Sequence, residues 1–263
     1  MDGPGIVKSA PVLLLSRMSD VLLYDYPGSI CSQMARLALE EKGVAYTRQT
    51  IDIMRAHEQF EPWYVALNPK SVVPTLRVGD RVICDTLRIV KCVDQQFEGP
   101  SLTPSNAETM DRMMREIMGL HYGVLLYSGH LDDNRTSATI IARGEFLREM
   151  LRDRPAHAAL LQGRIDGNVR MQAILKSETK VAVHLGAARH VVDAIEAALL
   201  RTKFVAADSY SLADTFATAA LARFRMHGFE NWWPRATHPG VNAYLAAMKA
   251  RPSWARAGVV DAP

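Results

Sequence analysis

The sequence contains only three cysteines in 263 residues, and no two of them are spaced as CxxC. An odd number without that spacing fits neither a disulfide framework nor a zinc site. The eight histidines form no HExxH motif, so we expect no metal. GxGxxG, P-loop and GxSxG patterns are also missing, so neither a nucleotide-binding protein nor a serine hydrolase is indicated.

Long apolar runs and a strong charge of one sign are missing as well. No run approaches the roughly 20 residues that span a bilayer, and the segment APVLLL is too short for a secretory signal. We therefore expect a cytoplasmic protein without membrane contact. The formal charge is +3, with 31 Lys and Arg scattered among 28 Asp and Glu. Without a basic stripe, nucleic acid is not an expected partner, whereas a small anionic substrate is mildly favoured.

The remaining composition, 48% hydrophobic and 22% charged, predicts a globular chain long enough for two domains. Residues 1–20 show no periodic apolar face, and we interpret them as a flexible extension. From Val21 the pattern alternates between strand and helix signals in the order β-α-β-α-β-β-α. The last two strands form a hairpin that turns at Gly79 and Asp80. This unit predicts a first domain over residues 21–98.

The segment EGPSLTPSN, with two prolines and a glycine, ends that pattern and indicates a linker. Nearly everything after it has helical periodicity, beginning with one helical segment from Met110 to Tyr127. The methionines at helical spacing are interpreted as core residues. We predict an all-helical second domain over residues 105–258.

Two polar residues stand at the start of the first helix. Ser29 and Cys31 occupy its first turn, where free N–H groups and the helix dipole stabilise a thiolate, either their own or that of a ligand. Taken singly, a serine there is most often a cap and a lone cysteine a small buried hydrophobe. Cys84 and Cys92 are interpreted as structural.

Three further motifs have a structural and a functional interpretation. Pro74 opens a strand, and a cis bond before it would turn the backbone N–H and C=O of Val73 outward to hold an extended peptide, whereas a trans proline would be ordinary. Asp85 and Thr86 begin a helix and either cap it or face an anion. The segment SLAD has capping-box spacing.

The motifs SICS, LNPKSVVP, DTLRIV and SLAD, in this order and context, resemble those of the glutathione transferase superfamily over about residues 21 to 255. The resemblance implies a thioredoxin-like α/β domain followed by an all-α domain, with glutathione as co-substrate and a homodimer. Within the superfamily, the sequence is most similar to the tetrachlorohydroquinone reductive dehalogenases, which are related to zeta-class maleylacetoacetate isomerases.

The resemblance also implies roles for single residues. Ser29 matches the serine that hydrogen-bonds the glutathione sulfur, and Cys31 matches the cysteine that attacks a glutathionyl intermediate. Val73 beside cis-Pro74 would hold the tripeptide backbone. Asp85 and Thr86 match the pair that binds the γ-glutamyl end, although Asp is shorter than the usual Glu and Thr replaces Ser. Lys70 is either a carboxylate contact or a solvated lysine.

The predicted function is glutathione-dependent transfer or reductive dehalogenation on an aromatic or quinonoid ring. Aryl-ether cleavage, maleylacetoacetate-type isomerisation and a non-catalytic glutathione-binding protein are the alternatives. The aromatic pocket is expected from the helical domain, and its candidates, each with core packing as the alternative, are Tyr122, Tyr127, His130, Phe224 and Trp232.

Overall fold

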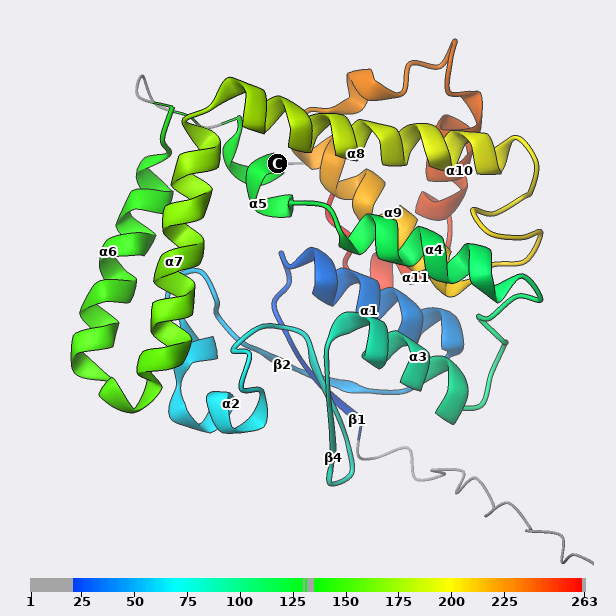
Figure 1. The fold of residues 1–263 in the computed structure, drawn as a ribbon. Helices are drawn as coiled ribbons and strands as arrows, with labels where there is room; N and C mark the ends of the chain where they lie inside the picture. The colour runs from blue at the N-terminus through cyan, green and yellow to red at the C-terminus, as the bar shows by residue number, and fades with distance from the viewer. Residues whose placement is uncertain (1–20, 130, 132–134, 262–263) are drawn as a thin grey trace, which may run out of the picture.

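The structure is a computed structural model that describes residues 21–129, 131 and 135–261. The predicted extension over residues 1–20 therefore lies outside the described residues. In chain order the elements are β1 (Val21–Asp25), α1 (Ile30–Lys42), β2 (Thr47–Thr50), η1 (Glu58–Phe60), α2 (Pro62–Leu67), β3 (Thr75–Val78), β4 (Arg81–Cys84), α3 (Thr86–Gln96), α4 (Ala107–Met118), α5 (Tyr122–Tyr127), α6 (Ala138–Asp153), η2 (Pro155–His157), α7 (Ala158–Leu175), α8 (Glu178–Leu199), α9 (Leu212–Met226), η3 (Glu230–Trp232), α10 (Pro239–Lys249) and α11 (Pro252–Arg256) (Figure 1). The predicted β-α-β-α-β-β-α order is confirmed.

The four strands form one mixed sheet in the order β2-β1-β3-β4. Strand β1 runs parallel to β2 and antiparallel to β3, and β3 and β4 form the predicted hairpin. The register pairs Tyr24 with Thr75 and Thr75 with Cys84. The end of β1, the start of β3 and the end of β4 therefore meet at one edge of the sheet.

Each face of the sheet is covered by helices because side chains alternate along β1. Leu23 points into the main core with α1 and α3, whereas Tyr24 packs with Tyr64 of α2 in a separate cluster on the other face. The sheet thus lies between α1 and α3 on one face and α2 on the other, as in a thioredoxin-like domain.

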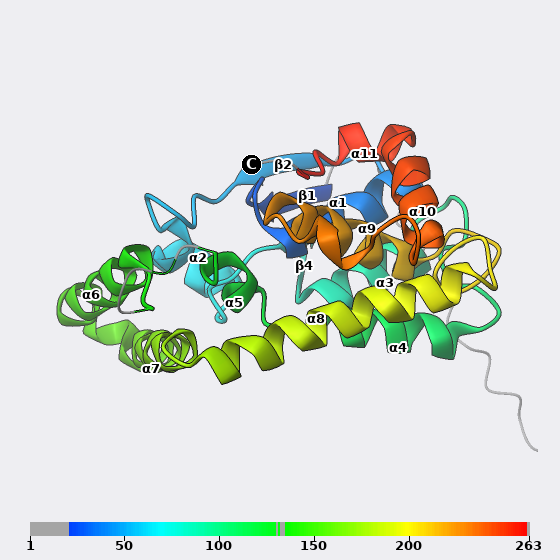
Figure 2. The same ribbon diagram turned by 90° about the horizontal axis from the view of Figure 1, so that it is seen from above.

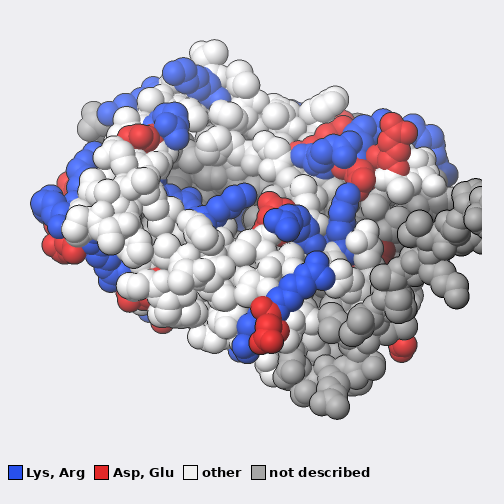
Figure 3. Space-filling view, turned by 60° about the horizontal axis from the view of Figure 1, so that its bottom comes forward, with Lys and Arg blue, Asp and Glu red and all other residues white. Residues whose placement is uncertain are grey.

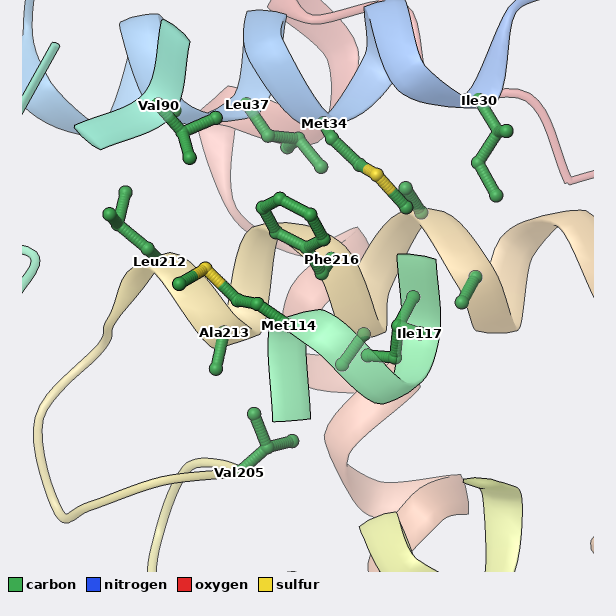
Figure 4. Close-up of a cluster of buried hydrophobic side chains, with 14 of the residues drawn as sticks. Ile30, Met34, Leu37, Val90, Met114, Ile117, Val205, Leu212, Ala213 and Phe216 are labelled. Carbon is green, nitrogen blue, oxygen red and sulfur yellow. The ribbon is translucent and has the colours of Figure 1, made fainter. Parts of the chain in front are cut away.

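The main core joins the two halves of the chain. Met34 and Leu37 of α1, three residues apart on one side of the helix, pack in the same cluster as Met114 of α4 and Phe216 of α9 (Figure 4). All four side chains are at most 1% exposed. The predicted core role of methionine is confirmed at Met114.

Helix α9 begins with the predicted capping box. The Asp214 carboxylate accepts hydrogen bonds from the Ser211 N–H and hydroxyl, both at 2.8 Å, and from the Val205 N–H at 3.1 Å. Burial raises the pKa of Asp214 to about 6, against the opposing effect of these hydrogen bonds. The box thus also ties the loop before α9 to its first turn.

The helical half differs from the expectation at one place near the cavity described below. The predicted helix from Met110 to Tyr127 is broken, because α4 ends at Met118 and α5 starts at Tyr122. The Tyr122 hydroxyl donates to the carbonyl of Ile117 at 3.0 Å and fixes the bend. Beyond it, α6 and α7 form an antiparallel hairpin on the same side as α2 and α5, apart from α9 to α11 (Figure 2). Among the described residues, no helix is long and apolar enough to cross a membrane.

Candidate functional site

Ser29 lies where β1 passes into α1. Its backbone is extended (φ −76°, ψ 124°), and its hydroxyl oxygen accepts from the Ser32 N–H at 3.3 Å, so it is the N-cap of α1. Within the described part of the chain, the Ser29 hydroxyl proton has no acceptor, and the side chain is on the wall of a cavity. It is therefore free to donate to a ligand.

Cys31 sits one residue further into the helix, in a different environment. It packs against the main core and does not line the cavity that Ser29 lines. Burial is the largest influence and raises the pKa of the Cys31 thiol, while a hydrogen bond with the Thr86 hydroxyl and the positive charge of Arg223 oppose it. The expectation that the helix start favours a Cys31 thiolate is thus outweighed by desolvation.

The other two cysteines occupy structural positions. Cys84 donates to the Leu67 carbonyl at 3.7 Å, and Cys92 is buried in the main core. All three thiols are free, and burial raises the pKa of each. No group of three or more His, Cys, Asp or Glu residues within the described ranges is placed to hold a metal.

The peptide bond between Val73 and Pro74 is cis, so the trans alternative is wrong. Two hydrogen bonds hold the loop before Pro74 in place, because the Tyr64 hydroxyl and the Asn68 amide both donate to the Val72 carbonyl, at 2.8 and 2.9 Å. By contrast, the backbone N–H and C=O of Val73 have no hydrogen-bond partner in the part of the chain that the structure describes. These two groups fit an extended peptide added beside the sheet.

The start of α3 brings the remaining predicted residues to the same sheet edge. Asp85 has a positive φ of 83° and caps α3 by accepting from the Arg88 N–H at 3.2 Å. Thr86 is buried, with its hydroxyl hydrogen-bonded to the Cys31 thiol. Lys70 is exposed. The assignment of these residues to glutathione stays a prediction.

A cavity of about 720 Å³ opens beside this edge. Its wall is formed by the start of α1, by α5, by the α6–α7 hairpin and by the end of α9. Two of the residues predicted for the aromatic pocket, Tyr122 and Tyr127 of α5, line this cavity. Ser29 and these two tyrosines thus face the same space, which suits a thiol and an aromatic electrophile.

The other three pocket candidates lie elsewhere. Phe224 is fully buried and Trp232 is 8% exposed, and their rings pack against each other in the main core with centroids 5.6 Å apart. Neither is on the cavity wall. Phe224 and Trp232 are therefore core residues, the alternative given for each of them, because the side of α9 that carries Phe224 faces the core. His130 lies outside the described residues.

Sequence reasoning missed the arginines of the cavity, which are Arg143, Arg164, Arg170 and Arg223. They are spread over α6, α7 and α9. These arginines come together only because the three helices lie around the same cavity, so no spacing pattern in the sequence predicts them.

Gly163 of α7 also lines the cavity, and a Cβ there would meet no heavy atom within 4 Å. We expect Gly163→Ala to stabilise the fold by about 1 kcal/mol through helix propensity, or roughly 2 to 4 °C in melting temperature. The added methyl group also narrows the cavity, so KM for a bulky electrophile should rise. Calorimetry and initial rates measure the two effects.

Gly186→Ala is the matched control, since Gly186 lies in α8, has the same open surroundings and is not on the cavity wall. It should give the same stabilisation with no change in KM. Equal KM values for the two variants would show that Gly163 does not shape the space used by substrate.

Comparison with known proteins places this arrangement in a family. Residues 28–96 match the family model described as glutathione S-transferase, N-terminal domain, and residues 160–252 match its C-terminal domain. The tetrachloro-p-hydroquinone reductive dehalogenase of Sphingobium chlorophenolicum is 34% identical over 92% of this chain and 97% of its own length. The chain belongs to the glutathione S-transferase family.

Two further similarities support the glutathione S-transferase assignment. Glutathione S-transferase TCHQD of Arabidopsis thaliana is 27% identical over 88% of this chain and 87% of its own length. The crystal structure of β-etherase LigF from Sphingobium sp. strain SYK-6 superposes with a TM-score of 0.71, covering 90% of this chain and 98% of that one at 20% identity. The second similarity shows the fold alone.

Proposed function

We propose that this glutathione S-transferase catalyses glutathione-dependent reductive dehalogenation of an aromatic or quinonoid substrate. The observation that carries the proposal is the Ser29 hydroxyl, whose proton has no acceptor among the described residues and which faces the cavity. The backbone N–H and C=O of Val73, also without a partner among the described residues, support it. In this proposal, Val73 holds the tripeptide and Ser29 donates to its sulfur. A hydrogen bond to a charged group is worth roughly 1.5 to 3 kcal/mol, which lowers a thiol pKa by about one to two units.

The proposed reaction has two sulfur steps. The glutathione thiolate first forms a C–S bond to the ring, and chloride leaves with the C–Cl electron pair. The Cys31 thiolate then attacks the glutathione sulfur, and the ring carbon takes up a proton as the C–S bond breaks. A second glutathione reduces the resulting Cys31 disulfide. The sum is ArCl + 2 GSH giving ArH + GSSG + HCl, in which the ring is reduced and two thiols are oxidised.

The placement of Cys31 supports a role after the first step. The Cys31 thiol is hydrogen-bonded to Thr86 at the start of α3 and does not line the cavity. Thr86 belongs to the predicted glutathione site, so in this proposal the thiol beside it attacks the glutathione sulfur and not the ring in the cavity.

Conjugation, aryl-ether cleavage and isomerisation need Ser29 but no turnover of Cys31, and a binding protein needs neither. Glutathione turnover with halogenated hydroquinones, aryl ethers and maleylacetone compares these functions. Oxidised glutathione formed with a dehalogenated ring supports the proposal. Affinity for glutathione without turnover of any of these compounds would leave the binding protein.

We also propose that the protein works as a homodimer, as the family resemblance implies, and that it is cytoplasmic, as the sequence pattern led us to expect. Sedimentation at micromolar concentration measures the assembly, and a single species of about 29 kDa would contradict it.

Ser29→Ala is expected to leave glutathione affinity nearly unchanged and to slow formation of the first adduct about ten- to a hundredfold at neutral pH. The loss follows from the thiol pKa rising by about one to two units, so it should shrink as pH increases. Pre-steady-state absorbance at several pH values measures it. Ser29→Thr, which keeps a hydroxyl, is the control, and a pH-independent loss would contradict the role of Ser29.

A further inference from the structure

Four arginines line the cavity: Arg143 of α6, Arg164 and Arg170 of α7 and Arg223 of α9. Among the described residues, none of the lining residues is Asp or Glu. Figure 3 shows a hollow on one face of the molecule with Lys or Arg atoms at its rim. The chain as a whole is close to neutral, so the clustering is local.

None of these four guanidinium groups pairs with a carboxylate in the described part of the chain. Arg164 donates to the carbonyls of Lys70 and Ser71, and Arg223 donates to that of Gly28. Arg143 makes no hydrogen bond within the described residues. Its positive charge acts on Arg164, where burial and Arg143 together lower the guanidinium pKa.

The α6–α7 hairpin does not need Arg143 for its own packing. Leu147 and Ile165 meet in a separate apolar cluster with Phe60, and Arg154 at the end of α6 pairs with Glu61 at 2.9 Å. Arg154 is thus paired with a carboxylate, whereas Arg143 has no such pair among the described residues. Two like charges placed together at a cavity oppose each other, and an anion between them relieves that cost.

We propose that Arg143 and Arg164 form a subsite for a carboxylate carried by the electrophilic substrate, an inference that rests on the proposed function. Guanidinium groups bind carboxylates through two parallel hydrogen bonds, so such a subsite also orients the ring. The substrate class is then an aromatic or quinonoid acid. Its ring lies between the arginines and Ser29, with Tyr122 and Tyr127 as the apolar walls.

Glutathione carries carboxylates of its own and is the second source of this chemistry. Its proposed contacts, Val73 and Thr86, are not on the cavity wall, whereas Arg143 is. Arg164 stands between the two regions, because it also holds the loop of Lys70 and Ser71. Arg143 is therefore the residue that separates a substrate carboxylate from that of glutathione.

The test compares 4-chloro-3,5-dinitrobenzoate with its methyl ester, which differ in one negative charge. Arg143→Gln should lower kcat/KM for the acid about ten- to a hundredfold, as expected for a lost hydrogen bond to a charged group, and change the value for the ester less than about twofold. KM for glutathione should stay the same. Arg148→Gln, the same charge change at an exposed position of α6 outside the cavity wall, should change none of these values.

Equal losses with acid and ester, or a rise in KM for glutathione alone, would overturn the subsite. If neither compound is turned over, the subsite is still measured by calorimetric titration, and the proposed function keeps its own test with halogenated hydroquinones. Arg143→Gln should then raise the Kd of the acid and leave that of the ester unchanged. Equal Kd values of the acid for the parent and the variant would refute the subsite independently of catalysis.

Discussion

Replacing Cys31 by serine is expected to stop reductive dehalogenation after its first step. The variant should consume one glutathione for each ring and accumulate a glutathionyl aromatic, because a hydroxyl at neutral pH is a far poorer nucleophile toward sulfur than a thiolate. Chromatography with mass detection measures the adduct. Intact mass of the parent during turnover should show a disulfide with glutathione at Cys31.

Cys84→Ser is the control, because Cys84 is a half-buried thiol outside the cavity that donates to the Leu67 carbonyl. It should dehalogenate as the parent does. If Cys31→Ser is as fast as the parent and no adduct accumulates, Cys31 is a packing residue, and conjugation, ether cleavage or isomerisation becomes the better function.

The pH dependence of the two steps should differ in the parent. Because burial raises the pKa of the Cys31 thiol, little thiolate is present at neutral pH, and its fraction grows about tenfold for each pH unit below that pKa. The step at Cys31 should therefore continue to accelerate after the step at glutathione has levelled off. Less adduct should accumulate at pH 9 than at pH 7.

Arg36→Ala is expected to lower the free energy of unfolding by about 3 to 5 kcal/mol, the cost of removing one partner of a buried ion pair, because Asp25 then keeps only the partly exposed Arg48. The Arg36 side chain is 1% exposed and pairs with Asp25, which is fully buried at the end of β1. Arg36 also donates to the carbonyls of Pro27 and Ala257. Urea unfolding followed by circular dichroism measures the loss.

Arg48→Ala tests whether burial is the cause. Arg48 pairs with the same Asp25 carboxylate at 2.9 Å, but its side chain is 36% exposed, so its loss should cost about 1 kcal/mol or less. The double variant Asp25→Leu, Arg36→Met should recover much of the stability that Arg36→Ala loses, since no charge stays buried. An equal loss for Arg36→Ala and Arg48→Ala would contradict this explanation.

Local signals in the sequence predict the parts of the site that depend on backbone. The cap at Ser29, the hairpin at Gly79 and the capping box of SLAD each follow from a few neighbouring residues, and the structure has all three. For the peptide bond between Val73 and Pro74, the sequence left the cis and trans isomers open, and the structure has the cis isomer. The domain limits at residues 21–98 and 105–258 stay predictions.

Side-chain direction on long helices is not encoded locally. Phe224 and Arg223 are neighbours on α9, yet Phe224 enters the core and Arg223 faces the cavity. Likewise, Arg143 and Arg164 become neighbours only through the turn between α6 and α7. The pKa of Cys31 depends on burial by distant segments in the same way, and the helix start alone predicts the opposite direction.

Through the hydrogen bond from Arg223 to the Gly28 carbonyl, the C-terminal half helps to hold the loop before Ser29, the residue proposed to activate the thiol. The residue that orients the loop before Ser29 comes from a helix almost two hundred positions later in the chain. An isolated N-terminal fragment would therefore lose this brace as well as the apolar cover of α1, and its serine would no longer be held in register with a bound sulfur. The proposed activation of glutathione is in this sense a property of the assembled protein and not of its thioredoxin-like half.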